Sequence, residues 1–269
     1  MGIVNATPDS FSTAVSGPDD DGVLRADPDQ VIAHARLLLS QGADMLDIGG
    51  ESTRPGAQPV DAEEEWRRLA PVLEALRDCG VPLSVDTFKP AIMRKVLDAG
   101  ADMINDIYGF RQPGAIEAVA GSRCGLCVMH MQGEPRTMEQ SPVYADIVAD
   151  VRQFLQLRIG ELRAAGVNNQ RIVLDPGFGF GKSVEHNYAL LGQVDQTVFD
   201  GLPILLGLSR KSMIGAVTGR DAGHRLAGSL AAALAGVQRG ANILRVHDVA
   251  ETRDALKVWE AVNTNGAIL

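Results

Sequence analysis

The stretch best suited to chemistry is Asp175-Pro-Gly-Phe-Gly-Phe-Gly-Lys182, which follows the apolar run Ile172-Val173-Leu174. A carboxylate at the end of a buried strand offers hydrogen-bond acceptors to the N–H edge of a planar ligand. The glycines let the backbone approach that ligand closely, and the phenylalanines offer it a flat apolar surface. A phosphate-binding loop would need glycine at position 176, where this chain has Pro176. We therefore reject a phosphate loop here.

Two later segments carry cations suited to an anion. Ser209-Arg-Lys-Ser212 stands between a strand pattern and a helix pattern, where backbone N–H groups and the helix dipole favour negative charge. Arg245 and His247 are two residues apart at the end of another strand pattern, so both side chains are expected on one side of it. Together they are suited to clamp a phosphate or diphosphate.

The loop Glu51-Ser-Thr-Arg-Pro-Gly56 offers a hydroxyl, a guanidinium and a proline turn, and is interpreted either as a cover over a substrate or as an ordinary turn. The sequence shows neither a metal-ligand cluster at standard spacing nor a Ser/His/Asp nucleophile arrangement. These residues therefore favour a site that works by positioning and charge stabilisation rather than by covalent catalysis.

A repeated phrase indicates which elements position these residues. At residues 41–48, 99–106 and 239–246 a helical pattern ends at a glycine and a short β-rich run follows, which is typical of a helix entering a parallel strand. We expect strands at residues 2–5, 44–48, 82–86, 102–106, 124–129, 171–174, 203–207 and 242–246. Helices are expected near residues 28–41, 61–79, 89–99, 113–121, 145–165, 184–195, 223–238 and 248–262.

Eight strand–helix units in 269 residues predict a single α/β domain over residues 1–269, a (β/α)8 TIM barrel, with an open doubly wound sheet as the alternative. In such a barrel the site lies at the C-terminal ends of the strands. For Asp47 and Asp106, which stand at such ends, loop-holding hydrogen bonds are the simpler interpretation. The recurrence of polar residues at the strand ends predicts a crater with both donors and acceptors, carrying Asn5, Asp47, Asp86, Asn105, Asp106, Met129, His130, Asp175, Ser209, Lys211, Arg245 and His247.

Composition narrows the function classes. A formal charge of −9 and the lack of a basic run argue against nucleic acid as a partner. No apolar stretch approaches membrane-spanning length, and the start has no signal-peptide pattern, so we expect a cytoplasmic protein without a membrane partner. Cys124 and Cys127 match Cys-x-x-Cys, but they are interpreted as two small hydrophobic residues of a buried strand, with opposite faces.

Eight motifs, in order and nearly end to end, resemble the dihydropteroate synthase family. They are Met1-Gly-Ile-Val-Asn-Ala-Thr-Pro-Asp-Ser-Phe-Ser12, Asp47-Ile-Gly-Gly-Glu-Ser-Thr-Arg-Pro-Gly56, Ser84-Val-Asp-Thr87, Ile104-Asn-Asp-Ile107, Met129-His-Met131, Asp175-Pro-Gly-Phe-Gly-Phe-Gly-Lys182, Ser209-Arg-Lys-Ser212 and Arg245-Val-His-Asp248. The resemblance implies a barrel enzyme of folate biosynthesis, a sulfonamide target and a homodimer. It would join p-aminobenzoate to 6-hydroxymethyl-7,8-dihydropterin diphosphate, with Mg²⁺, and release pyrophosphate.

The resemblance also implies a role for individual residues. The pterin would be bound by Asp86, Asn105, Met129, Asp175, Lys211 and Arg245. The p-aminobenzoate pocket would contain Phe11, Thr53, Pro55, Phe180, Ser209, Lys211 and Ser212. Pyrophosphate contacts would come from Asn5, Thr53, Arg245 and His247, with Asn5 as the metal-linked group. The residues closest to the chemistry would be Asn5, Lys211, Arg245 and His247.

Three alternatives remain at this point. The first is a methyl-tetrahydrofolate transferase on a similar barrel, against which the diphosphate clamp of Arg245 and His247 argues. The second is a pterin-binding paralogue without turnover, suggested by residues 13–22, which depart from the Asp-Gly-Gly that relatives commonly carry. Within that segment Asp19, Asp20 and Asp21 are expected to form a solvated turn. The third is an unrelated phosphate-binding barrel.

Overall fold

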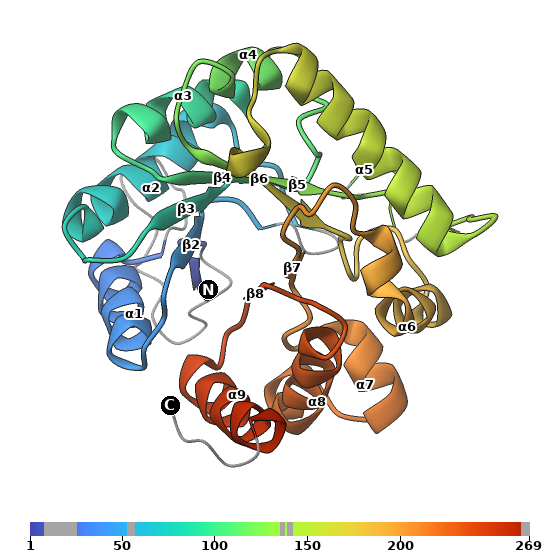
Figure 1. Ribbon diagram of the computed structural model, residues 1–269. Helices are drawn as coiled ribbons and strands as arrows, with labels where there is room; N and C mark the ends of the chain where they lie inside the picture. The colour runs from blue at the N-terminus through green and yellow to red at the C-terminus, as the bar shows by residue number, and fades with distance from the viewer. Residues whose placement is uncertain (8–25, 53–56, 135–137, 139–141, 265–269) are drawn as a thin grey trace.

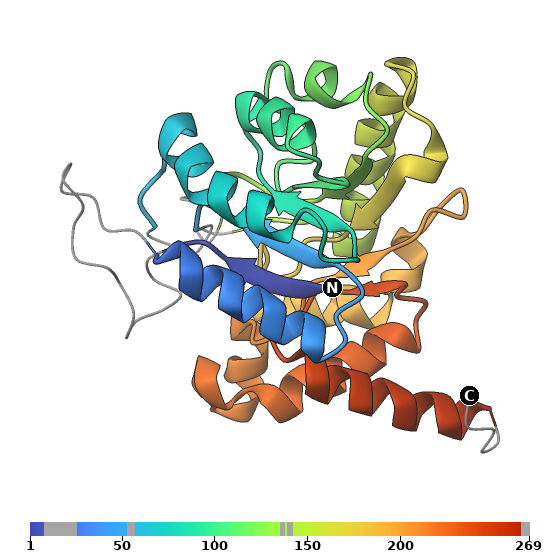
Figure 2. The ribbon, with the colours of Figure 1, turned by 90° about the vertical axis from the view of Figure 1, so that its left-hand side faces the viewer.

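The computed structural model describes residues 1–7, 26–52, 57–134, 138 and 142–264. Strands and helices alternate along the chain, and a ring of helices surrounds the strands (Figures 1 and 2). The strands are β1 (Gly2–Asn5), β2 (Leu46–Gly49), β3 (Leu83–Asp86), β4 (Met103–Asp106), β5 (Gly125–Met129), β6 (Ile172–Asp175), β7 (Leu205–Leu206) and β8 (Ile243–Leu244).

The α-helices are α1 (Pro28–Ser40), α2 (Ala62–Leu76), α3 (Pro90–Asp98), α4 (Ala115–Val119), α5 (Ile147–Ala164), α6 (Val184–Gly192), α7 (Ser212–Thr218), α8 (Leu226–Val237) and α9 (Val249–Asn263). Short 3₁₀ helices are η2 (Asn169–Arg171), η3 (Val194–Thr197) and η4 (Ala222–His224). Within the described residues, no helix has the length and apolar character needed to cross a membrane.

The strands close into a barrel. β1 to β6 form one parallel sheet in sequence order, and β7 pairs with β8 in a second. Parallel bridges between Gly2 and Val246 and between Leu174 and Ile204 join the two sheets at both edges. Because the first and last strands are thereby connected, the predicted (β/α)8 barrel is confirmed and the open sheet is wrong.

Strand β5 shows how alternation separates two packing layers. Leu126 and Val128 belong to the large hydrophobic cluster between strands and helices, whereas Cys127 packs inside the barrel with Met103 and Leu205. Cys124, just before the strand, belongs to the outer cluster, and both cysteines are buried free thiols. The prediction of two small buried residues facing opposite ways is therefore confirmed.

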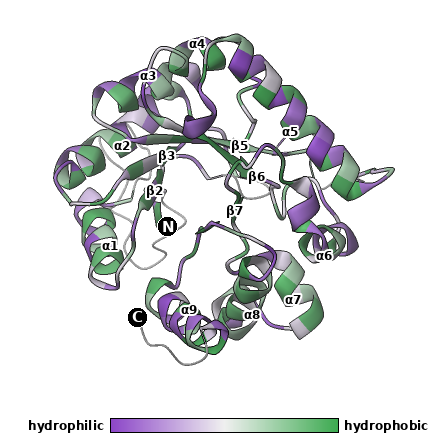
Figure 3. Ribbon diagram, viewed as in Figure 1, coloured by the Kyte–Doolittle hydropathy of each residue, from purple (hydrophilic) through white to green (hydrophobic). Residues whose placement is uncertain are grey.

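Helix α5 shows the matching pattern on the helical layer. Its buried residues Val151, Leu155, Ile159 and Leu162 recur every three or four positions, which places them on one face. Figure 3 shows hydrophilic and hydrophobic residues alternating along this helix, as expected for a helix covered on one side only.

The three repeated junctions have the predicted backbone. Gly42, Gly100 and Gly240 have φ values of 89°, 98° and 92°, in the left-handed region that ends a helix. Each lies between the end of a helix and the start of the strand that follows it in the chain.

The element predictions were wrong in two places. Helix α7 was not expected, because its seven residues include Gly215 and give too short a periodic pattern. Strands β7 and β8 have only two residues each, whereas five were predicted for each. Pro203, which has no N–H to donate, starts the predicted range of β7 but lies outside the observed strand.

Candidate active site

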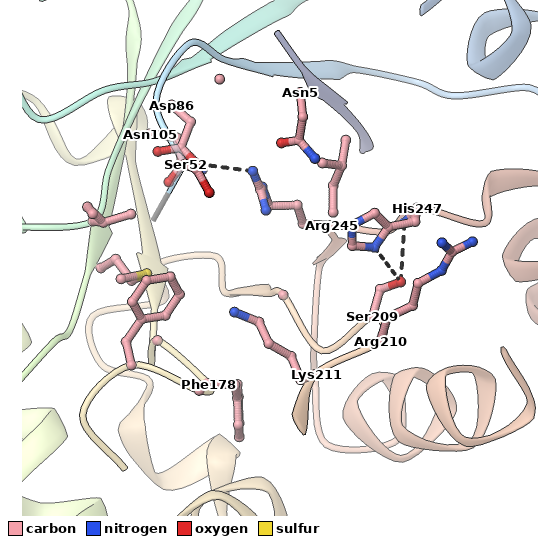
Figure 4. Close-up of a pocket in the computed structure, with 18 of the residues that line it drawn as sticks. Asn5, Ser52, Asp86, Asn105, Phe178, Ser209, Arg210, Lys211, Arg245 and His247 are labelled. Carbon is pink, nitrogen blue, oxygen red and sulfur yellow. Dashed lines mark hydrogen bonds and ion pairs between the residues drawn. The ribbon is translucent and has the colours of Figure 1, made fainter. Parts of the chain in front are cut away.

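A cavity of about 700 Å³ lies at the C-terminal ends of the strands (Figure 4). The described residues to which the family resemblance gives a role all line it, namely Asn5, Asp86, Asn105, Met129, Asp175, Phe180, Ser209, Lys211, Ser212, Arg245 and His247. Asp47, Asp106 and His130, which were also expected in the crater, do not line the cavity. Phe11, Thr53 and Pro55 lie outside the described residues, as does the segment 13–22. The predicted crater of donors and acceptors is therefore present where the barrel architecture requires it.

Arg245 lies between two carboxylates in this cavity. Its Nε donates to Asp47 Oδ2 over 2.5 Å, and its Nη2 donates to Asp86 Oδ2 over 3.0 Å. Burial lowers the pKa of Arg245, but the two carboxylates outweigh that effect and raise it above its usual value. The guanidinium therefore stays charged and is held in one orientation by its planar fork of donors.

Burial raises the pKa of two carboxyl groups in the cavity. The pKa of Asp86 rises to about 7, against the opposing effect of Arg245. The pKa of Asp175 rises to about 6, although the Gly177 N–H and Lys211 stabilise its charged form. Carboxyl groups with perturbed pKa values that gather in one cleft are typical of a functional site.

The segment from Asp175 to Lys182 is folded by its glycines. Gly177, Gly179 and Gly181 have φ values of 70°, 76° and 60°. At Gly177 a Cβ would stand 1.9 Å from His130 O, so the backbone approaches β5 more closely than any side chain permits. Asp175 Oδ1 accepts from Gly177 N over 2.7 Å and fixes the start of the turn.

Lys182 closes this segment from inside. Its Nζ lies 2.8 Å from Gly177 O, 3.0 Å from Phe180 O and 2.9 Å from His130 Nδ1. Burial lowers the pKa of Lys182 to about 7, and burial with the nearby Lys182 lowers the pKa of His130. The lysine of the apparent phosphate loop therefore binds its own backbone, which agrees with the rejection of that motif.

Lys211 and Phe180 lie in contact on the lining of the cavity. Lys211 Nζ lies 4.3 Å from the centre of the Phe180 ring. Burial, followed by the charge of Arg245, lowers the pKa of Lys211 to about 8. Phe180 also packs against a cluster of buried residues that includes Met129 and Met138. Phe178, the other phenylalanine, is buried in the large outer cluster, although it also borders the cavity.

Ser209 and His247 also line the cavity, and Figure 4 shows them next to Arg245. Ser209 Oγ accepts from the His247 backbone N–H over 3.2 Å and lies 3.0 Å from His247 Nδ1. Burial and the charges of Arg210 and Arg245 lower the pKa of His247 to about 3, so this imidazole is neutral near pH 7. Arg210 is itself paired with Asp248.

Asn5, at the end of β1, could bind a metal ion whose other ligands come mostly from substrate phosphates and water. Among the described residues, no group of three or more His, Cys, Asp or Glu side chains is placed to hold a metal. Mg²⁺ is commonly bound through one or two protein oxygens together with substrate phosphates and water. The amide oxygen of Asn5, which borders the cavity, suits that pattern.

Asp47 and Asp106 were both interpreted as loop-holding residues, and the structure supports this for only one of them. Asp106 accepts from the backbone N–H groups of Tyr108 and Phe110 over 2.7 and 2.8 Å, which confirms its loop-holding role. The same interpretation is wrong for Asp47, which binds Arg245, Ser84 and Asn105 inside the barrel. Sequence reasoning missed this arrangement because alternation gives the face of Asp47 but not its partners.

The fold and the cavity are typical of a barrel enzyme with a polar site. Comparison with known proteins gives the class of enzyme. A family model described as pterin binding enzyme matches residues 1–247. Dihydropteroate synthase from Neisseria meningitidis serogroup B is 51% identical over 98% of this chain and 93% of that protein. The enzyme of the same name from Escherichia coli K12 is 45% identical over 97% of this chain and 90% of that protein.

Two solved structures agree in fold and sequence. Burkholderia cenocepacia dihydropteroate synthase complexed with 7,8-dihydropteroate gives a TM-score of 0.88 at 54% identity, covering 98% of this chain and 91% of the other. Xanthomonas albilineans dihydropteroate synthase with 4-aminobenzoic acid gives 0.88 at 50% identity, covering 98% and 92%. The chain belongs to the pterin-binding enzymes and, among them, to the dihydropteroate synthase family.

Proposed function

We propose that this enzyme condenses p-aminobenzoate with 6-hydroxymethyl-7,8-dihydropterin diphosphate, giving 7,8-dihydropteroate and pyrophosphate for folate biosynthesis. The observation that carries the proposal is one cavity that joins acceptors, at Asp86, Asn105 and Asp175, to cations at Lys211 and Arg245. The Burkholderia complex with 7,8-dihydropteroate and the Xanthomonas complex with 4-aminobenzoic acid support the same substrates.

The pterin would be held at the acceptor end. Asp175 and Asn105 would accept hydrogen bonds from ring N–H groups, and Asp86 would do so beside them. Met129 and Arg245 would pack against the ring, and Lys211 would donate to a ring acceptor. This division suits a heterocycle that carries donors and acceptors on the same edge.

Departure of the diphosphate would be assisted by Arg245 and His247. Ser209 Oγ accepts from the His247 backbone N–H, and we assign its own proton to the contact with His247 Nδ1. The neutral imidazole then carries its proton on Nε2, which would donate to a diphosphate oxygen. Mg²⁺ at Asn5 would supply further charge neutralisation, and Thr53 is proposed as another diphosphate contact.

The second substrate would enter beside the pterin. Phe180, Ser209, Lys211 and Ser212 line that side of the cavity, and we place Phe11, Thr53 and Pro55 in the same pocket. Ser212 begins helix α7 and would contact the carboxylate of p-aminobenzoate. The amine would attack the methylene carbon from the side opposite the leaving diphosphate, so the enzyme supplies position and charge rather than a nucleophile.

Three further features belong to this proposal. The complex of the Yersinia pestis enzyme with a sulfonamide drug supports sulfonamide binding by this chain as well. A homodimer and a cytoplasmic location stay predictions.

The test is a pyrophosphate-release assay with purified enzyme. Release should require both substrates and Mg²⁺, and isotopically labelled p-aminobenzoate should appear in the pterin product. Label in a product without pyrophosphate release, or pterin binding without turnover at saturating substrates, would contradict the proposal. The second result would instead favour a non-catalytic paralogue.

Two variants test the pterin site itself. Asp175→Asn and Lys211→Ala should abolish pterin binding measured by calorimetry, because each removes a charged group that faces the ligand. Near-normal affinity in both variants would remove the assignment of these two residues.

A further inference from the structure

Asp47 is a buried carboxylate at the centre of the site whose partners are all polar side chains. Its exposed fraction is 0%, and the described residues that line the cavity do not include it. Ser84 Oγ donates to its Oδ1 over 2.6 Å, and Asn105 Nδ2 donates to its Oδ2 over 3.1 Å. Its position therefore lets it act on a ligand only through other residues.

The bond to Asn105 fixes which end of that amide is left for a ligand. A carboxylate accepts only, so the Asn105 group facing Asp47 must be the NH₂ and not the carbonyl. Among the described residues, Asn105 Oδ1 has no hydrogen-bond partner although it is buried. A buried acceptor of this kind costs free energy unless a ligand completes it, and Asn105 borders the cavity.

The bond to Arg245 fixes the second group. Asp47 binds Nε and Asp86 binds Nη2, so two edges of the same planar guanidinium are held. Rotation of this plane would break at least one charge-assisted hydrogen bond. One oxygen, Asp47 Oδ2, thus sets both the amide of Asn105 and the plane of Arg245.

We propose that Asp47 is a positioning residue for the pterin: it turns the Asn105 carbonyl oxygen toward the ligand and holds the Arg245 plane parallel to the ring. The inference rests on the proposed function, since it takes the pterin as the ligand of these two side chains. The Asn105 carbonyl oxygen then acts as a fixed acceptor, and it disfavours a heterocycle that has an acceptor at the position facing Asn105.

The test is a double-mutant cycle on pterin affinity, measured by calorimetry with Asp47→Asn, Asn105→Ala and the double variant. Asp47→Asn should weaken pterin binding by about 10- to 100-fold, since it disturbs charge-assisted hydrogen bonds. In the Asn105→Ala background the same change should have an effect smaller by about threefold or more, because contacting residues are coupled. Equal effects in both backgrounds would overturn the inference.

Asp106→Asn is the matched control. It makes the same chemical change at a buried aspartate two strands away, in β4, whose partners are loop amides. Both variants should lose stability in urea unfolding, but only Asp47→Asn should lose pterin affinity. Similar loss of affinity in both would mean that Asp47 supports the barrel in general, and would also overturn the inference.

Ser84→Ala keeps the inference testable where Asp47→Asn does not fold. It removes only the hydrogen bond to Asp47 Oδ1 and leaves the charge in place. We expect about threefold weaker pterin binding, the scale of one hydrogen bond, and unchanged affinity would count against the positioning role. If the wild-type enzyme neither binds the pterin nor releases pyrophosphate, the proposed function fails instead.

Discussion

Gly177 gives the sharpest test of how the acceptor loop is built. It has φ of +70°, and a Cβ there would stand 1.9 Å from the carbonyl oxygen of His130 and 3.2 Å from Met129 Cγ. The first of these is a backbone atom of the residue that follows β5, and it cannot rotate away. Gly177→Ala therefore requires the loop or the strand to move.

The cost has two parts. An L-residue with positive φ costs about 1–2 kcal/mol. Displacing packed backbone to admit one methyl group costs about 1–3 kcal/mol more. Gly100 separates the two parts, because it has φ of +98° and nothing within 4 Å of the same methyl position. Gly177→Ala should therefore destabilise the enzyme by about 2–5 kcal/mol, and Gly100→Ala by about 1–2 kcal/mol.

Urea unfolding of both variants measures these costs, and calorimetry with the pterin measures the effect on the site. Only Gly177→Ala should weaken pterin binding, because the displaced turn carries the Asp175 carboxylate. If both variants lose the same stability, or if Gly177→Ala binds the pterin normally, the close approach to β5 does not shape the site.

Three more predictions follow from the charges. kcat/KM for the pterin should rise through about pH 6, because Asp175 ionises there. It should fall above about pH 8, because Lys211 loses its proton. A profile that is flat from about pH 5 to 9 would contradict both pKa values. Lys89→Met leaves the carboxylates of Glu51 and buried Glu65 without their shared cation, and should cost about 3 kcal/mol in urea unfolding, against a negligible loss for exposed Lys257→Met. Burial lowers the pKa of Lys182 to about 7, so the unfolded chain binds more protons above that pH and stability should rise from about pH 7 to 10. Lys182→Met should flatten that rise in unfolding measured across this range, and an unchanged slope would refute the assignment.

The sequence predicted the site well where side-chain alternation determines the answer. In a parallel strand the residue that ends it on the inner face points into the barrel mouth, which is how Asp86, Asn105 and Asp175 could be placed without coordinates. Arg245 and His247, two residues apart, were placed on one side for the same reason and both border the cavity.

Prediction failed where the answer depends on contacts between distant segments. Arg245 and Asp47 are 198 residues apart in the chain, and no local pattern shows that they bind each other. The partners of Lys182, which are His130 and backbone carbonyls, likewise could not be predicted from the sequence. Such partners are set by the closure of the barrel, which sequence periodicity does not describe.

The pairing of Arg245 changes how the diphosphate charge must be met. Its Nε and Nη2 are already bound to Asp47 and Asp86, so this guanidinium enters the cavity with its charge largely compensated. It is therefore better suited to packing on a neutral ring than to balancing a diphosphate alone. His247 is neutral near pH 7 and contributes a donor rather than a charge. Lys211 and Arg225 are further cations on the cavity lining, and the proposed Mg²⁺ at Asn5 would neutralise negative charge that they leave.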